Sequence, residues 1–216
     1  YYRSRMQMAK TAIGRAFSGI DDSYRVGFIT INPSGDIAGR FLANADFDAT
    51  QKQAWYQKLY DQTDHGSTPL REALARVGRY YGNVTGGINS GMAASPIQVS
   101  CQPSYAILTT DGYWNGNAGQ TLTGGSINNQ DNVNAGYSTR TDGAYDGALA
   151  GSSDTLADVA MYYYKTDLRT DLNDNVPTTQ KDNAAHQHMV TFTVGLGLAG
   201  LLNFDKNYEE QTTGDF

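Results

Sequence analysis

Two short stretches carry oxygen-bearing side chains at positions suited to ligand binding. In Gly66-Ser67-Thr68-Pro69-Leu70 a threonine precedes a helical pattern, and in Thr109-Thr110-Asp111-Gly112 a carboxylate follows a short apolar run. Helix N-termini and the carboxyl ends of strands share one edge of an open α/β sheet, so Thr68 and Asp111 are expected on the same rim. Hydroxyl and carboxylate oxygens suit Mg2+, Ca2+ or Mn2+ better than zinc or copper. Thr68 and Asp111 are therefore candidate metal ligands.

A purely structural interpretation of these two residues stays open. Thr68 can cap the following helix through its hydroxyl, with Pro69 at the first helical position, and Asp111 can brace an Asp-Gly turn. Both roles are local and need no ligand.

Other candidate metal sites are less complete. The run Asp171-Leu172-Asn173-Asp174-Asn175, with Asp182 at the twelfth position, imitates a calcium loop but has Val176 where an EF-hand needs glycine. We interpret it as a solvated turn rich in Asx residues. His65, His186 and His188 have no neighbouring Cys or Glu to complete a zinc site.

The sequence lacks the common catalytic motifs. It contains no Gly-x-Ser-x-Gly elbow, no phosphate-binding Gly-x-x-x-x-Gly-Lys and no His-Glu-x-x-His. Gly195 to Gly200 imitates a dinucleotide fingerprint, but Asn203-Phe204-Asp205 interrupts the helix that should follow. A hydrolase acting through Asp111 lacks a nucleophile and base. We therefore expect a protein that is not an enzyme.

Composition and charge argue against several kinds of partner and against a membrane-spanning segment. The net charge is −6, from 16 basic and 22 acidic residues without a basic cluster, which argues against nucleic acid and anionic membranes as partners. No apolar run approaches the roughly 18 residues needed to span a bilayer. The single cysteine, Cys101, has no partner for a disulfide in this sequence. Abundant Gly and Tyr, with 18% charged residues, suggest an extracellular protein.

The elements that position these residues alternate between helices and apolar strands. Helical periodicity covers Ser4–Ser18, Asp48–Gln62, Thr68–Tyr81 and Asp154–Tyr163, and Asp154 is the expected N-cap of the last of these helices. Strand patterns cover Tyr24–Ile31, Ile37–Ala43, Tyr105–Leu108 and His188–Gly195, and the second of these is expected to be a short edge strand. This order predicts an α/β fold with a doubly wound, mainly parallel sheet and helices on both faces. Residues 1–216 are expected to form one domain, with a long loop insertion at about 112–153.

Several aromatic residues fall within this insertion. They are Tyr113, Trp114, Tyr137 and Tyr145. Tyrosine and tryptophan often anchor binding surfaces, so these four are candidates for contact with a partner, while burial in the core stays open as the alternative.

The stretches around Thr68 and Asp111 resemble the second and third metal-site loops of von Willebrand factor A-type domains. Longer stretches resemble the PilY family of type IV pilus tip-associated proteins, in the family's order and over nearly the whole chain. They are Tyr2–Met6, Pro96–Gln102, Tyr105–Asn115, Leu156–Tyr164, Lys165–Arg169, Gln187–Gly197 and Thr213–Phe216.

This resemblance implies a von Willebrand factor A-like, Rossmann-like fold with a metal-ion-dependent adhesion site. Thr68 matches the threonine of the site's second loop and Asp111 the aspartate of its third. The first loop, Asp-x-Ser-x-Ser, has no match here, so we expect the sequence to start just past the first strand. It is also expected to stop before the family's last helices and its C-terminal β-propeller.

The resemblance further implies a binding and assembly module at a type IV pilus tip, outside the cell of a Gram-negative-type bacterium. Its expected partners are minor pilins, a surface or host-cell receptor and the rest of its own chain, with a divalent cation as cofactor. Cys101 is expected to pair with a cysteine outside this segment. The alternative is a load-bearing tip domain with a vestigial metal site, packed on minor pilins.

Overall fold

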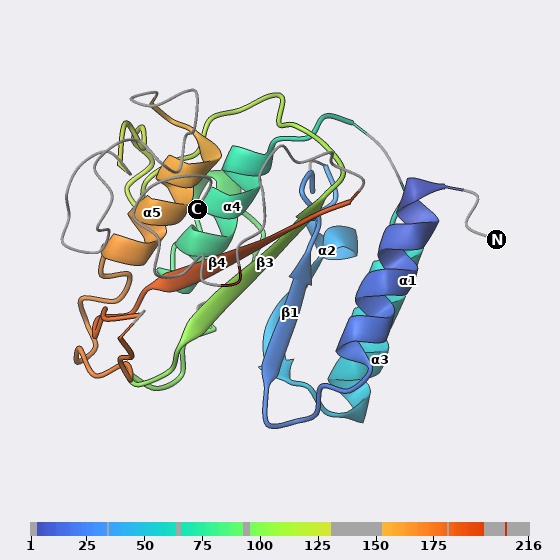
Figure 1. Cartoon of the computed structure of the whole chain (residues 1–216), viewed down its shortest axis with the longest axis horizontal. Helices are drawn as coiled ribbons and strands as arrows, with labels where there is room; N and C mark the ends of the chain where they lie inside the picture. The colour runs from blue at the N-terminus through green and yellow to red at the C-terminus, as the bar shows by residue number, and fades with distance from the viewer. Residues whose placement is uncertain are drawn as a thin grey trace.

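The computed structural model describes residues 4–33, 35–63, 66–92, 96–130, 153–180, 182–196 and 206. These residues form, in order, α1 (Arg5–Phe17), β1 (Arg25–Ile29), α2 (Ile37–Arg40), β2 (Phe41–Asp46), α3 (Ala49–Asp61), α4 (Leu70–Tyr81), η1 (Gly87–Asn89), β3 (Ser104–Thr110), α5 (Leu156–Lys165) and β4 (Met189–Gly195). Strand β1 pairs with β2 antiparallel, and β3 pairs with β4 parallel (Figure 1). The fold is mixed α/β.

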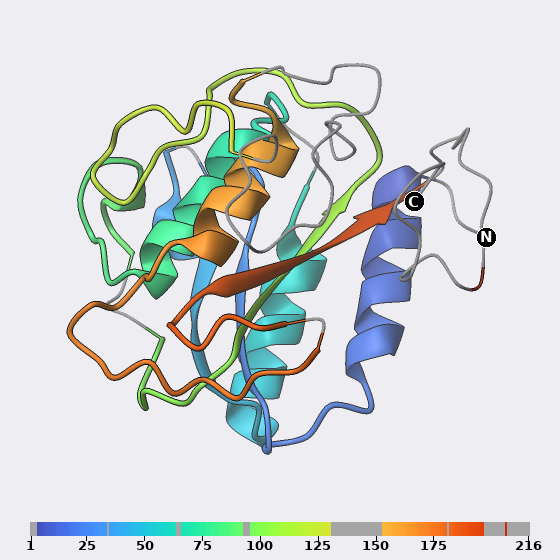
Figure 2. The same ribbon diagram turned by 60° about the vertical axis from the view of Figure 1, so that its left-hand side comes forward.

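The β1–β2 pair packs with α1 and α3 around an aromatic core. Phe47, Trp55 and Leu59 are buried there, with Phe17 and Phe28 packed against them. Both views show α1 and α3 lying side by side (Figures 1 and 2). The helices begin where short polar side chains cap them: Ser4 accepts from the backbone N–H of Gln7, and Asp48 accepts from that of Gln51.

The β3–β4 pair packs against α4 and α5 around a second core. Its buried members are Leu74, Ala75, Tyr81, Ile97, Ala106, Ile127, Val159, Tyr163, Leu168 and Met189. Helices α4 and α5 run close together (Figure 2). Gly78 allows this approach, because a Cβ built there would lie 2.2 Å from the Tyr163 ring.

Helix α4 connects the two strand pairs. Ten of its twelve residues are buried, including Glu72, Arg76 and Arg79. The Tyr80 hydroxyl accepts from the backbone N–H of Asn44 in β2 at 3.1 Å, and the Tyr81 hydroxyl donates to the Tyr105 carbonyl of β3 at 2.9 Å. Helix α4 therefore bonds to both the β1–β2 pair and the β3–β4 pair and fixes their relative positions.

The prediction of a mainly parallel sheet is wrong for the first strand pair. Residues 30–40 join β1 to β2, and a parallel crossover needs a dozen or more residues, so the chain returns antiparallel. The predicted strand from Ile37 to Ala43 begins instead as helix α2, capped by Asp36, and only its last residues enter β2.

The expected N-cap at Asp154 is also wrong. Thr155 caps α5 in a capping box with Asp158, while the Asp154 carboxylate accepts from the backbone N–H of Asn128 at 2.9 Å. The predicted insertion is described up to residue 130 and from residue 153, and its other residues lie outside the described ranges. Across the described parts of the chain, each helix is too short or too polar to cross a membrane.

Alkaline pH is expected to unfold the β3–β4 half. Burial raises the pKa of Tyr81 to about 12 and raises the pKa of Tyr163 further. The unfolded chain releases these protons near pH 10, so the stabilisation is complete below pH 10 and is lost as pH rises through about 12. For Tyr81 the loss amounts to roughly 3 kcal/mol. Tyrosinate absorbance and circular dichroism should change together; titration of Tyr81 within intact secondary structure would contradict this.

Candidate functional site

The two stretches singled out in the sequence lie on neighbouring loops. The Asn115 side-chain oxygen accepts from the backbone N–H of Thr68 at 2.7 Å, and the backbone N–H of Asn115 donates to the Thr68 carbonyl at 3.0 Å. These two bonds join the segment before α4 to the segment after β3. They place Thr68 beside the loop that contains Asp111, on the rim where the carboxyl end of β3 lies.

The loop after β1 reaches the same rim. The Asn32 side-chain amide donates to the Ser67 carbonyl at 3.3 Å. Gly66 has a φ of +71°, and a Cβ there would lie 2.7 Å from the Asn32 amide nitrogen. Glycine is therefore required at this position both by its backbone conformation and by the close approach of Asn32.

Asp111 faces solvent at the end of β3. Its Oδ2 lies 3.4 Å from an Arg5 guanidinium nitrogen, and about half of its side chain is exposed. The turn that follows is braced by Thr110, whose hydroxyl accepts from the backbone N–H of Gly112 at 3.4 Å. The structural role proposed for Asp111 therefore belongs to its neighbour.

Thr68 does not cap helix α4. The helix begins at Leu70, with Pro69 in the N-cap position and no side-chain cap hydrogen bond. The first turn instead closes through the backbone, where Leu70 donates to the Thr68 carbonyl and Ala73 to that of Pro69, both at 2.9 Å. The expected threonine cap is therefore wrong.

Thr68 and Asp111 alone form an incomplete metal site. Among the residues that the structure describes, no three His, Cys, Asp or Glu side chains gather in a group able to hold a metal ion. Both donors are hard oxygens that suit Mg2+ or Ca2+, but a cation bound by them needs further oxygens from water or from elsewhere.

The carboxylates of Asp171 and Asp182, in the calcium-like run at residues 171–182, are bound by other side chains. Arg169 binds both carboxylate oxygens of Asp171 at 2.8 Å, which lowers the pKa of Asp171. Asp182 instead accepts from the Tyr164 hydroxyl at 3.0 Å and lies 3.1 Å from the buried His188 ring. The carboxylates of the calcium-like run therefore face different groups.

Of the histidines that the structure describes, His186 and His188 have ring centroids 5.6 Å apart, and a ring nitrogen of each lies close to a backbone carbonyl. The Nδ1 of His188 lies 2.8 Å from the His186 carbonyl, and the Nε2 of His186 lies 3.1 Å from the Tyr164 carbonyl. His65 lies outside the described residues.

The predicted aromatic contacts are only partly described. Tyr113 is 88% exposed, and Trp114 lies under the Arg71 guanidinium, with the Cζ of Arg71 5.9 Å from the ring centroid. Tyr137 and Tyr145 lie outside the described residues. Tyr113 is therefore the member of this group whose ring the structure places in solvent.

Sequence reasoning missed an exposed apolar surface on the β3–β4 pair. Tyr105, Ile107, Phe192 and Val194, here called the apolar β3–β4 face, are between 46% and 57% exposed. Because Tyr105 to Leu108 is apolar on both faces, the sequence suggested a fully buried strand. The alternation of Phe192 and Val194 with Thr191 and Thr193 is the signal that β4 has two different faces.

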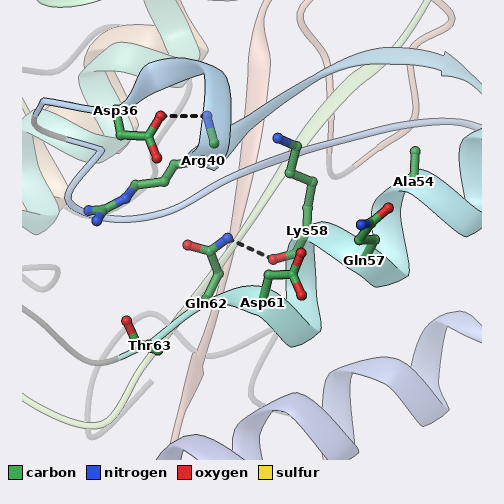
Figure 3. A pocket seen from close by; sticks show the side chains of 9 residues that line it. Asp36, Arg40, Ala54, Gln57, Lys58, Asp61, Gln62 and Thr63 are labelled. Carbon is green, nitrogen blue, oxygen red and sulfur yellow. Dashed lines mark hydrogen bonds between the residues drawn. The ribbon is translucent and has the colours of Figure 1, made fainter.

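A polar pocket of about 440 Å3 lies between α2 and the last turns of α3. It is lined by Asp36, Gly39, Arg40, Ala54, Gln57, Lys58, Asp61, Gln62 and Thr63 (Figure 3). Several of these side chains are held by backbone groups: Arg40 donates to the Asn32 carbonyl at 2.8 Å and Gln62 to that of Lys58 at 2.7 Å. None of the residues singled out from the sequence lines this pocket.

Cys101 is exposed. We expect it to be linked by a disulfide to a cysteine of the longer protein, so it should resist alkylation until a reductant is added. Mass spectrometry of the native protein after treatment with iodoacetamide measures this. Quantitative labelling of Cys101 without reductant would contradict the prediction.

The fold and the rim define a mixed α/β domain with oxygen donors on loops at one edge. Among curated proteins, the chain is similar to the type IV pilus biogenesis factor PilY1 of Pseudomonas aeruginosa. It is 31% identical to the protein of strain PAK over 95% of the chain, 32% to that of strain PAO1 over 92%, and 30% to that of strain UCBPP-PA14 over 99%.

The chain spans about a fifth of the length of these relatives. It is therefore related to a segment of the PilY1 type IV pilus biogenesis factors, and the predicted resemblance to the PilY family is confirmed. No family model matches the chain, and no solved structure matches it.

Proposed function

We propose that this chain is a non-enzymatic module of a longer PilY1-like protein that supports type IV pilus biogenesis at the pilus tip, outside the cell. The observation that carries the proposal is the similarity to PilY1 over at least nine-tenths of the chain. Minor pilins and a surface or host-cell receptor are its proposed partners.

Counting surface pili tests this function. In the bacterium that encodes the chain, removal of residues 5–195 from the full-length gene should abolish pili on electron micrographs while the remaining protein is still produced. The Gln53→Ala variant, which changes one exposed side chain of α3, should keep normal piliation. Normal pilus numbers after the deletion would contradict the proposed role.

We further propose a von Willebrand factor A-like domain whose rim takes part in a metal-ion-dependent adhesion site. Two observations support this proposal: the Asn115 bonds bring the Thr68 and Asp111 loops together, and neither side chain has the structural role that sequence reasoning offered as the alternative. Thr68 and Asp111 would each donate one oxygen. Water, upstream residues and a carboxylate of the partner would supply the others.

The second candidate is a load-bearing tip domain with a vestigial metal site. The Arg5–Asp111 ion pair favours it, because the guanidinium already supplies a positive charge to the carboxylate. In this case the module acts through its surfaces alone.

Metal-dependent stability distinguishes the two candidates. In the longer protein, Mg2+ or Mn2+ at ten times its Kd should stabilise the domain by about 1.4 kcal/mol, because the cation binds only the folded state. Asp111→Ala should erase the rise in Tm measured by calorimetry, whereas Asp174→Ala, at an exposed aspartate in a remote turn, should preserve it. An equal rise in the Asp111 variant would exclude the site, and no rise in either protein would favour the load-bearing domain.

A further inference from the structure

We propose that Asn115 and Gly116 form a self-modifying site, in which the Asn115 side chain loses its nitrogen as ammonia and the residue becomes aspartate or isoaspartate. The conversion consumes water and needs no enzyme. Its product places a new carboxylate on the rim beside Thr68 and Asp111. The use of this carboxylate as a metal ligand rests on the proposed function, in which the rim takes part in a cation site.

The attacking group is the backbone nitrogen of Gly116. Asn115 is the one asparagine in the sequence that precedes a glycine, and glycine has no Cβ to hinder attack by its own nitrogen on the preceding side chain. Both residues are exposed, and Gly116 has a φ of +89°. Among the residues that the structure describes, none accepts a hydrogen bond from the Gly116 N–H. The nucleophile is therefore accessible and not engaged elsewhere.

The attacked group is the Asn115 side-chain amide, which the fold activates. Its oxygen accepts from the backbone N–H of Thr68 at 2.7 Å. Attack on Cγ places negative charge on this oxygen, and a fixed backbone N–H stabilises that charge as the donors of an oxyanion hole do. The bond from the Asn115 N–H to the Thr68 carbonyl and the bond from Arg71 to the Gly116 carbonyl, at 3.3 Å, hold the reacting residues in place.

The reaction proceeds in two steps. The Gly116 nitrogen forms a bond to Cγ of Asn115 while the bond from Cγ to Nδ2 breaks, and the proton lost by the Gly116 nitrogen leaves with Nδ2 as ammonia. The remaining ring is a succinimide. Water then opens this ring: addition at Cγ gives aspartate, and addition at the backbone carbonyl carbon gives isoaspartate. No oxidant or reductant takes part.

Asn117 provides a matched control on the same loop. It is also exposed, but its Nδ2 donates to Oε2 of the buried Glu72 at 2.6 Å, so the nitrogen that would leave is held by a carboxylate. The residue that follows is Ala118, which has a Cβ. Asn117 therefore lacks the arrangement that Thr68 and Gly116 give to Asn115.

The product changes the chemistry of the rim. Aspartate at position 115 keeps an oxygen that accepts from the Thr68 N–H, and its second oxygen is a hard donor of the kind that Mg2+ and Mn2+ prefer. Isoaspartate lengthens the backbone by one carbon and also carries a carboxylate on this loop. The incomplete pair formed by Thr68 and Asp111 thus gains a third oxygen donor.

Peptide mapping of the purified longer protein, incubated at neutral pH in 18O-labelled water, tests the conversion. The label marks residues that react during the incubation rather than during sample handling. Folded protein is compared with protein in urea. We expect Asn115 to convert at least as fast in the folded protein, because unfolding removes the Thr68 donor, and Asn117 to convert about tenfold more slowly than Asn115. Slower conversion of Asn115 in the folded protein, or equal rates at the two asparagines, would overturn the proposal.

Manganese titration by calorimetry tests the donor role. In the longer protein, Asn115→Asp should bind Mn2+ about tenfold more tightly than the parent. Asn83→Asp adds the same charge beyond the opposite end of α4 and should leave the affinity unchanged. Equal affinities in the two variants, or no Mn2+ binding in either, would overturn the donor role. The pilus counts described above depend on neither experiment, so failure of this site and failure of the proposed function are distinguishable.

Discussion

Replacing Trp55 by alanine is expected to lower the free energy of unfolding by about 4 kcal/mol, the largest effect of any single substitution proposed for this chain. Trp55 is 2% exposed at the centre of the β1–β2 core. Its ring stacks on Phe17 with centroids 4.5 Å apart and meets Phe28 and Phe47 edge-on. Alanine would leave a cavity that two helices and two strands surround, and a rigid aromatic cluster of this kind cannot collapse to fill it.

Trp55 also supplies a hydrogen bond. Its indole N–H donates to the Gly27 carbonyl at 3.2 Å, beside the irregularity in the β1–β2 register. Trp55→Phe keeps most of the ring and loses this bond, so it should cost about 1 to 2 kcal/mol. Urea unfolding followed by circular dichroism measures both variants. Tyr24→Ala, at an exposed aromatic residue, is the control, and a Trp55→Ala effect as small as the control's would show that this cluster does not stabilise the fold.

Replacing Arg79 by methionine is expected to lower the free energy of unfolding by about 3 kcal/mol. Arg79 is 4% exposed on α4, and its guanidinium donates to four acceptors: the carbonyls of Gly86, Thr121 and Leu122 and the side-chain oxygen of Asn89. Methionine keeps the length and the packing of the aliphatic stem. It leaves buried acceptors unsatisfied, and each such group costs about 1 to 3 kcal/mol.

The Arg79 variant should also loosen the loops that the guanidinium holds. Hydrogen exchange at Gly124 and Asn89, whose backbone N–H groups bond to the Thr121 and Gly86 carbonyls, should become faster than in the parent. The exposed residue Arg15 provides the control, because Arg15→Met changes the same atoms in solvent. Unchanged stability and exchange in the Arg79 variant would mean that water replaces the guanidinium at little cost.

Local structure was largely predictable from the sequence. The helices over Arg5–Phe17 and Ala49–Asp61 begin next to the polar residues that cap them, and β3 and β4 lie where the sequence shows strand patterns at Tyr105–Leu108 and His188–Gly195. Caps, apolar periodicity and turn residues act within a few positions along the chain, so the sequence contains their cause directly. The relation to PilY1 was also accessible, because it depends on the order of residues alone.

The tertiary structure decided the features that depend on distant residues. The antiparallel β1–β2 pairing follows from a short connection, and the open face at Tyr105 and Ile107 follows from which helices cover β3. At the candidate site, the sequence supplied Thr68 and Asp111 as oxygen donors. Only the fold showed that Asn115 joins their loops, that Arg5 pairs with Asp111, and that backbone bonds replace the predicted threonine cap. The Asn115 and Arg5 contacts join residues far apart in the sequence, and their free energy depends on packing and burial that no local pattern encodes.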